Sequence, residues 1–362
     1  MTIGIDASPA YRKNKTGIEW YAWHITKGLV ETQNEQMQFC VYTDKSPNDG
    51  IPGVKPIVLN WPSKYFWQEF RLSWEMLAHR PDILFVPSRA LPLMLPKKTI
   101  TTIHDVGFIR YPDERKALSR EYLIMTSRRA AQVATKILTV SEFSKREIIE
   151  LFGISPEKIG VTYLGYDHAS YIPLGTQQSH ERPYILCIGR RERRKNQTML
   201  VRAYEILKEQ MGKDTPRLII QGPRGHHAAE LDEVIAKSSA VQDITVTDWV
   251  SEEEKVRLLQ RAWCLVHPSL YEGFGLPVIE AQACGIPVVC SSAAALPEIT
   301  GDGGLFFNPK NSEEMASQIR RVCIEVDTRK KLIENGLKNA QRFSWKTTVA
   351  RTLEIITSNV LQ

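Results

Sequence analysis

The chain has 362 residues, of which 43% are hydrophobic, and a formal net charge of +6. This length exceeds one ordinary hydrophobic core, so we expect two domains. The excess of positive charge is mild, and the sequence has no zinc-ligand spacing, no RNA-binding signature and no long basic run, so we expect no nucleic-acid partner.

The cysteines and the apolar segments indicate the cellular compartment in which the protein is expected. The six cysteines are scattered without a CxxC pair, and several fall in apolar segments, so buried free thiols in a reducing compartment are expected. The N-terminus lacks the apolar core of a signal peptide, and no run of about 18 apolar residues would span a membrane. We expect a cytoplasmic protein, with peripheral contact at the inner face of the cell membrane left open.

The chain begins with a predicted strand at residues 2–6, and Thr16-Gly17 is predicted to open an amphipathic helix. A strand, a glycine and a helix start in succession suit a phosphate group. A plain loop glycine before a helix is equally compatible with the pattern. Further strands are predicted at 39–42 and 54–59.

Aromatic and basic residues are concentrated between Trp61 and Trp74, where Phe70, Arg71 and Trp74 follow at helical spacing. Aromatic rings beside lysine and arginine are typical of contact with a membrane surface. Such a stripe more often packs into a core. The loop at 91–98 has an apolar tip and leaves open whether it faces an acceptor, a lipid or its own domain.

A predicted strand at 98–103 ends in His104-Asp105. Ligands bind beyond the carboxyl ends of parallel strands, so His104 is a candidate site residue, although a lone histidine is more often structural. A helix follows at 115–134, and Ser141 is expected to cap the next one.

The second half opens with a predicted strand at 184–188 and a loop from Gly189 to Asn196 that holds five basic residues. Such a loop suits a diphosphate, because its cations offset the negative charge and stabilise a leaving diphosphate. The adjacent pair His226-His227 is weak as a metal site, since it has no evident carboxylate partner. No metal is expected.

The most informative segment runs from His267 to Gly285. Its predicted elements are a strand at 263–266, a tight loop Glu272-Gly273-Phe274-Gly275, a helix over 278–284 that Gly285 closes, and a strand at 287–290. In a parallel sheet this loop lies at the edge where ligands bind.

Two carboxylates belong to this segment. Glu272 lies in the loop and Glu280 one turn into the helix, with seven residues between them. The helix start offers N–H groups at Phe274, Gly275 and Leu276, which suit a phosphate. Carboxylates there would repel the ligand unless they accept hydrogen bonds from hydroxyl groups that flank the phosphate, one group on a sugar and one on a ribose.

The sequence YEGFGLPVIEAQACGIPVV resembles the Glu-x7-Glu signature of retaining GT-B glycosyltransferases of family 4. The loop after 184–188 is similar to that family's Gly-Arg-x4-Lys loop, and TIHDVGF is similar to its acceptor-domain histidine motif. The resemblance covers nearly the whole chain and is stronger in its second half. It implies an α/β fold of two Rossmann-like parallel-sheet domains that face a cleft.

The resemblance also implies domain boundaries. These are an N-terminal acceptor-side domain at 1–167, a linker at 168–182, a nucleotide-sugar-binding domain at 183–342, and a C-terminal helix at 343–362 that returns to the first domain.

The implied activity is retaining transfer of a hexose from a nucleotide-diphosphate sugar, without cofactor or metal. In this family Glu272 would bind hydroxyl groups of the transferred sugar, and His104 would face that sugar from the opposite wall. No convincing carboxylate nucleophile for double displacement is present, and the resemblance suggests same-face attack by the acceptor as the diphosphate leaves.

The implied donor-binding residues lie around the diphosphate, the ribose or the base. They are Arg190, Lys195, Gly273, Phe274, Gly275, Leu276, Glu280, Gly17 and Val250. Arg190 and Lys195 hold the diphosphate, Glu280 takes the ribose hydroxyls, and the backbone near Val250 edges the base. The intervening Arg191, Arg193 and Arg194 are interpreted as solvated.

The leading donor is GDP-mannose, with a glycan or polyprenyl-linked acceptor in cell-surface polysaccharide synthesis, from overall similarity to mannosyltransferase-like members. UDP-glucose and UDP-N-acetylglucosamine stay open, as do a nucleotide-sugar 2-epimerase and a silent nucleotide-sugar-binding protein. A nicotinamide dehydrogenase is excluded, because Val278 stands where the third glycine of the dinucleotide fingerprint belongs.

Overall fold

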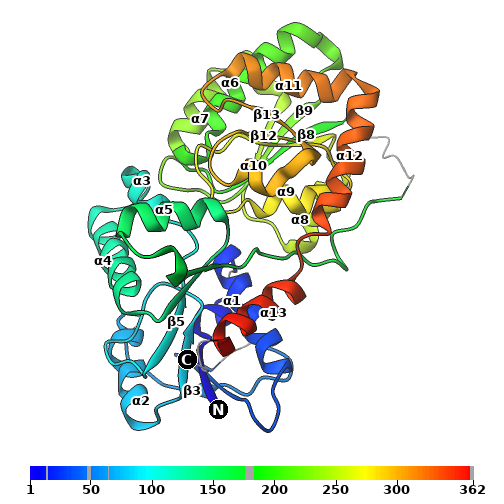
Figure 1. Cartoon of the computed structure of the whole chain (residues 1–362). Helices are drawn as coiled ribbons and strands as arrows, with labels where there is room; N and C mark the ends of the chain where they lie inside the picture. Colours follow the sequence, from blue (N-terminus) through cyan, green and yellow to red (C-terminus); the bar gives the residue numbers. More distant parts are fainter. Residues whose placement is uncertain (14, 47–49, 64, 176–182, 359–362) are drawn as a thin grey trace. The chain divides into compact units, whose positions relative to one another are not determined.

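The chain folds into two compact units, which a computed structural model describes over residues 1–13, 15–46, 50–63, 65–175 and 183–358 (Figure 1). The first unit comprises residues 1–110, 117–165 and the chain from 345 onward, and the second comprises 111–116 and 166–344. Of the linker expected at 168–182, residues 176–182 lie outside the described part. So do Lys64 and residues 359–362 at the end of the expected C-terminal helix.

The first unit is built on a seven-stranded sheet in the order β3-β2-β1-β4-β5-β6-β7, and all its strand pairs are parallel. The strands are β1 (Thr2–Asp6), β2 (Gln38–Thr43), β3 (Ile57–Val58), β4 (Ile83–Val86), β5 (Lys98–Thr102), β6 (Lys136–Thr139) and β7 (Ile159–Val161). The strand predicted at 54–59 is thus reduced to two residues.

Strand β4 lies at the centre of this sheet and is absent from the sequence-based prediction. Its four residues are all buried. A continuous apolar run of four residues has no alternation, so periodicity alone does not distinguish it from a helix segment. Because β1 and β4 are neighbours, the strand order reverses between them.

The described residues of the first unit form six α-helices. They are α1 (Gly17–Glu31), α2 (Ser73–Ala78), α3 (Gly107–Arg110), α4 (Ala117–Val133), α5 (Glu142–Phe152) and α13 (Trp345–Ser358). The predicted cap of α5 is confirmed, because Ser141 Oγ accepts a hydrogen bond from the N–H of Ser144 at 3.0 Å. Helix α13, from the far end of the chain, packs beside α1 (Figure 1).

The second unit has a six-stranded parallel sheet in the order β10-β9-β8-β11-β12-β13. Its strands are β8 (Tyr184–Ile188), β9 (Arg217–Gln221), β10 (Ile244–Thr247), β11 (Cys264–His267), β12 (Val288–Ser291) and β13 (Gly304–Phe307). Its helices are α6 (Gln197–Met211), α7 (Ala228–Ala236), α8 (Glu252–Arg261), α9 (Leu276–Ala283), α10 (Leu296–Thr300), α11 (Ser312–Ile324) and α12 (Val326–Ala340).

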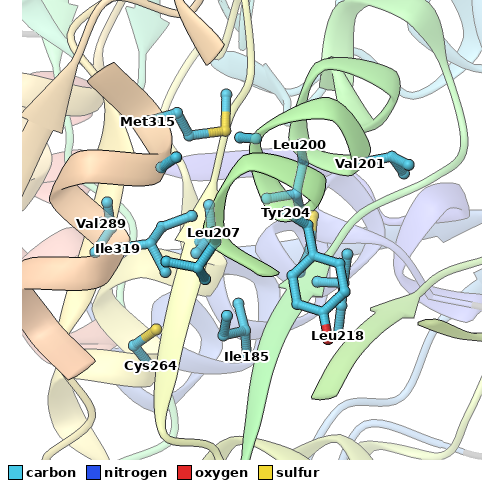
Figure 2. Packing of buried hydrophobic residues seen from close by; sticks show 14 of the residues in the cluster. Ile185, Leu200, Val201, Tyr204, Leu207, Leu218, Cys264, Val289, Met315 and Ile319 are labelled. Carbon is cyan, nitrogen blue, oxygen red and sulfur yellow. The ribbon is translucent and has the colours of Figure 1, made fainter. Parts of the chain in front are cut away.

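The core of the second unit lies between its sheet and the pair α6 and α11 (Figure 2). Leu200, Tyr204 and Leu207 recur at helical spacing on α6 and are fully buried. The one polar atom of Tyr204 is satisfied, since its hydroxyl donates to Pro216 O at 2.9 Å. This packing holds the strands in place, and the loops that follow their carboxyl ends lie outside the core.

Among the described residues, no helix has both the length and the apolar character required to cross a bilayer.

The contact between α1 and α13 gives a prediction for Gly28. A Cβ added there would lie inside van der Waals contact with the Val349 side chain, which is stiff in a helix. We expect Gly28→Ala to lower the free energy of unfolding by about 1–3 kcal/mol. In a Val349→Ala background the same change should stabilise the chain by up to about 1 kcal/mol, because alanine favours the helix.

Urea unfolding of the wild type, the two single variants and the double variant measures this reversal of sign. An equal effect of Gly28→Ala in both backgrounds would contradict the packing of α13 on α1.

Candidate active site

Two loops of the second unit meet where its strand order reverses. Strands β8 and β11 are neighbours, with Ile185 paired to Cys264 and Leu186 to Leu265. The loop after β8 leads into α6, and the loop after β11 leads into α9. Both loops therefore leave the carboxyl edge of the sheet at its topological switch point, where open α/β sheets bind ligands.

Asn196 ties these loops together. It adopts a left-handed conformation with φ 57°, which asparagine tolerates better than most residues. Its buried side-chain amide donates to Pro268 O at 3.1 Å and to Pro309 O at 2.7 Å. The N–H of Leu270 adds a bond to Arg194 O at 2.8 Å. The loop after β8 is thus held in register with the loop after β11.

The Glu272 carboxylate is the centre of the site. Its Oε1 accepts hydrogen bonds from Lys195 Nζ, from His267 Nε2 at 2.9 Å and from Ser269 Oγ at 2.8 Å. The residue is 8% exposed. The structure therefore brings Glu272 and Lys195, both predicted site residues, into direct contact.

The ionisation of Glu272 follows from this environment. Burial disfavours the carboxylate, but the charge of Lys195 and the bond from His267 outweigh burial and hold the pKa of Glu272 well below its ordinary value. The group is an anion at neutral pH and has most of its hydrogen-bonding capacity on Oε1 filled. Its chemistry is that of an oriented acceptor rather than a proton donor.

Arg194 joins the site, although it was interpreted as solvated. Its guanidinium lies 3.7 Å from Glu272 Oε2 and donates to Glu192 Oε2 at 3.1 Å. Glu192 also lies 3.5 Å from Arg190 Nε. Arg190 is half-exposed, so its guanidinium is available to an incoming anion beside Arg194.

The other two arginines of the loop differ in burial. Arg191 is 6% exposed, and its guanidinium lies 3.6 Å from Asp232 and 3.7 Å from Asp248, so its interpretation as solvated is wrong. Arg193 is exposed and pairs with Glu230 on the surface.

Helix α9 begins beside these cations. Its N-cap is Gly275, with φ 108°, a conformation in which a Cβ would also collide with Leu296. Gly275 has no side chain with which to cap the helix, and no acidic residue lies in the helix's first turn. The backbone of Gly273, Phe274 and Leu276 therefore lies at the positive end of the α9 dipole, where an anion is favoured.

Glu280, on α9, lies in a second buried cluster. It is 6% exposed, and its Oε1 accepts from Lys255 Nζ at 2.9 Å. Lys255 also lies 2.9 Å from Glu252. Burial disfavours the ammonium, but the two glutamates outweigh burial and raise the pKa of Lys255. Lys255, unremarked in the sequence, thus neutralises a predicted donor-binding carboxylate.

One oxygen of Glu280 remains unfilled. Its Oε2 is buried and has no hydrogen-bond partner among the described residues. The neighbouring Tyr171 hydroxyl donates instead to Glu252 at 3.1 Å. Burial and the charges of Glu280 and Glu252 raise the pKa of Tyr171, so it keeps its proton. Glu280 is therefore held through Oε1 by Lys255 and has Oε2 left as an acceptor.

His104 lies in the first unit, directly after β5. Its Nε2 is 3.3 Å from Pro87 O, an acceptor only, so Nε2 carries the proton and Nδ1 is the acceptor. The ring stands perpendicular to Tyr21, with centroids 4.7 Å apart. Burial lowers the pKa of His104 from 6.5 to about 4, so the ring is neutral at physiological pH.

Gly17 and Val250 take less distinctive positions. Gly17 is the first residue of α1, whose N-terminus is already occupied by a capping box, with Glu19 Oε2 accepting from the N–H of Thr16 at 2.8 Å. That end of α1 therefore has a carboxylate of its own. Val250 follows β10, in a loop anchored by a bond from Gln221 to Asp248 O at 3.1 Å.

Sequence reasoning missed five residues of the site, which are Arg194, Lys255, Tyr171, His267 and Ser269. The first three act through partners that are distant in the sequence. His267 and Ser269 did carry a signal, since polar residues at the end of a buried strand mark the ligand-binding edge of the sheet.

Comparisons with known proteins agree with this architecture. A solved structure of sucrose-phosphate synthase from Thermosynechococcus elongatus superposes with a TM-score of 0.80 at 18% identity, covering 99% of both chains. This likeness confirms the predicted GT-B fold.

Sequence comparison gives the family. Residues 175–339 match the family described as Glycosyl transferases group 1, and residues 15–170 match Glycosyltransferase Family 4. The O-antigen chain mannosyltransferase B of Escherichia coli is 32% identical over 78% of this chain and 76% of its own length. The O-antigen chain mannosyltransferase RfbU of Salmonella typhimurium is 30% identical over 74% and 71%. The chain therefore belongs to the group 1, family 4 glycosyltransferases, and its activity is the transfer of a sugar.

Proposed function

We propose that this protein is a retaining mannosyltransferase that moves mannose from GDP-mannose to a glycan or polyprenyl-linked acceptor in cell-surface polysaccharide synthesis. The observation that carries the proposal is the contact of Glu272 with Lys195 at the switch point, beside the start of α9. The choice of mannose draws on the mannosyltransferases among its relatives.

The diphosphate binds between the basic loop and α9. Lys195 and Arg190 supply cations, Arg194 adds a third, and the helix terminus supplies N–H groups. These groups offset the charge that develops on the departing diphosphate, which is the role a metal ion would otherwise fill. Transfer is therefore expected to be independent of added divalent metal and insensitive to EDTA.

The two glutamates orient the donor. Glu272 accepts from hydroxyl groups of mannose, and Glu280 accepts from the ribose through its unfilled Oε2. His104 presents Nδ1 as a neutral acceptor to the sugar. None of these groups needs to change protonation state during transfer.

The reaction proceeds on one face of the sugar. The bond from the anomeric carbon to the diphosphate oxygen breaks, the bond to the acceptor oxygen forms, and the acceptor proton passes to the departing diphosphate. Glu272 is a weak nucleophile toward the anomeric carbon, because three hydrogen bonds to Oε1 and the charge of Lys195 lower the basicity of the carboxylate. This supports direct displacement over a glycosyl-enzyme intermediate.

The donor is tested by thermal unfolding with GDP, UDP, ADP and dTDP sugars. A ligand present at about a hundred times its Kd adds roughly 2.7 kcal/mol of stability. We expect GDP-mannose to raise the unfolding midpoint and the other donors to leave it unchanged. If only UDP sugars raise the unfolding midpoint, the donor is a UDP sugar and not GDP-mannose. If no sugar nucleotide raises it, the proposal is contradicted. Donor binding without transfer would indicate a silent binding protein.

The catalytic charges are tested by Lys195→Ala and Glu272→Ala, each of which should lower kcat by about 10²-fold or more. Arg193→Ala is the matched control on the same loop and should retain activity, because Arg193 is exposed and pairs with the surface residue Glu230.

Loss of folding is separated from loss of chemistry by a double variant. Lys195→Ala leaves the buried carboxylate of Glu272 without its cation and should also lower the unfolding midpoint. Lys195→Met with Glu272→Gln removes both charges, so it should recover stability without recovering transfer. Wild-type turnover in Glu272→Ala would overturn the assignment of the site.

The role of Glu280 is tested through Lys255. We expect wild type to bind GDP at least about tenfold more tightly than 2′,3′-dideoxy-GDP, since hydrogen bonds to a charged group contribute about 1.5–3 kcal/mol. Lys255→Met removes the cation that fixes Glu280, so it should weaken GDP binding and bring the affinities for GDP and 2′,3′-dideoxy-GDP closer together. Arg257→Met, on the exposed side of α8, should change neither the GDP affinity nor the ratio of the two affinities. Calorimetry measures both affinities, and an unchanged ratio in Lys255→Met would refute the role of Glu280.

A further inference from the structure

An apolar face of the first unit remains uncovered. The segment that passes from a π-helical turn (Trp67–Leu72) into α2 exposes Phe66, Phe70, Trp74 and Leu77, with Trp74 67% and Phe70 54% exposed. The expected packing of this stripe into a core is wrong for Phe70 and Trp74. Trp67, Leu72 and Met76 turn inward instead, and the indole N–H of Trp67 donates to Leu59 O at 2.8 Å.

Helix α4 extends this face. Leu118, Tyr122 and Met125 recur at helical spacing, and Leu118 and Met125 are exposed. The rings of Tyr122 and Phe66 meet edge to face, with centroids 6.5 Å apart. The apolar rows of the two helices are therefore continuous.

The loop before β5 adds its tip to the same face. Leu93 and Met94 are exposed, and their N–H groups both donate to Ser73 Oγ, at 2.7 and 3.3 Å. Arg129 holds the loop from α4 by donating to Leu91 O at 3.0 Å and Leu93 O at 3.1 Å. The tip is thus fixed next to Trp74. We call Phe66, Phe70, Trp74, Leu77, Leu93, Met94, Leu118, Tyr122 and Met125 the aromatic face.

Cations lie at the margin of the aromatic face. Arg80 is exposed and donates to Leu95 O at 2.8 Å, immediately beyond the loop tip. Lys97 is exposed two residues further on, and Arg128 is exposed one turn from Met125 on α4.

The carboxylates of the same elements are occupied within the protein. Glu69 accepts from the Tyr122 hydroxyl, and Glu75 is buried against Arg71 and His79. Glu121 is exposed but lies 2.8 Å from Arg120. The net field at the margin is therefore positive, which favours an anionic partner.

The backbone at Phe66 is strained. Its φ of 61° places a bulky residue in the left-handed region, which side chains of this size rarely adopt. That conformation accompanies a ring that is 53% exposed instead of buried. Strain of this kind persists where a local structure serves a function.

We propose that the aromatic face docks the protein on an anionic lipid bilayer, an inference that rests on the proposed function insofar as a lipid-linked acceptor is presented there. Apolar bodies with aromatic rings enter the headgroup boundary, while marginal lysine and arginine side chains meet anionic lipid. Isolated monomers rarely leave a contiguous apolar face of this kind open to water.

Sedimentation with lipid vesicles tests the proposal on the full chain. We expect wild type to bind vesicles of phosphatidylglycerol and phosphatidylethanolamine, to bind neutral phosphatidylcholine vesicles at least tenfold more weakly, and to lose affinity as salt is raised. The Phe70→Ser, Trp74→Ser double variant should bind the anionic vesicles at least tenfold more weakly than wild type.

Two controls accompany this variant. Trp249→Ser removes an exposed tryptophan of the second unit, 58% exposed, and should leave vesicle binding unchanged. The double variant should keep the wild-type unfolding midpoint and the thermal response to GDP-mannose, since it removes only exposed rings.

Equal vesicle binding by wild type and the double variant would overturn the proposal. Absence of vesicle binding by wild type would overturn the proposal too. If light scattering then shows a wild-type dimer that the double variant does not form, the aromatic face is a contact with a second copy of the chain. Vesicle binding does not require a donor. If no donor shifts the unfolding midpoint but the vesicles bind wild type more tightly than the double variant, the proposed function is refuted. The role of the aromatic face in membrane docking is then still supported.

Discussion

The buried ion pair between Glu272 and Lys195 is the interaction on which the second unit depends. A carboxylate removed from water is costly unless it is paired and hydrogen-bonded, and here three donors converge on one oxygen. Those donors come from two different loops. The loops must therefore be held in register, and Asn196 does this with two buried amide bonds. The packed sheet beneath them, with its continuous core, supplies the rigidity that this register requires.

The two glutamates show how one short segment separates two tasks. Glu272 belongs to the loop and takes its cation from the loop after β8, whereas Glu280 belongs to α9 and takes its cation from α8. Each carboxylate is thus neutralised by its own lysine. The pKa of Glu272 is held well below its ordinary value, and the helix between the two carboxylates starts at a glycine. A cluster of cations, a helix N-terminus and two fixed acceptors together match a diphosphate flanked by hydroxyl groups.

Local rules predicted much of this from the sequence. The glycine loop, the proline in the first turn of α9 and the stop at Gly285 each follow from backbone preferences. The contrast between Arg191 and Arg194 could not be predicted, because burial of either guanidinium depends on Asp232, Asp248 and Glu272 from other elements.

The same limit applies elsewhere in the chain. Lys255 resembles any surface lysine of an amphipathic helix until α9 places Glu280 against it. Strand β4 was missed because four apolar residues carry no period, and the outward direction of Trp74 was missed because helical spacing does not say which face of a helix is covered.

The return of α13 to the first unit has a consequence for synthesis. The second unit is complete in sequence at Ser344, but the first unit lacks the helix that packs against α1 until α13 has also been translated. Most of the first unit precedes the second unit in the chain, yet its folding can be completed only after the second unit has been made, and a chain that stops short of α13 leaves the buried surface of α1 uncovered.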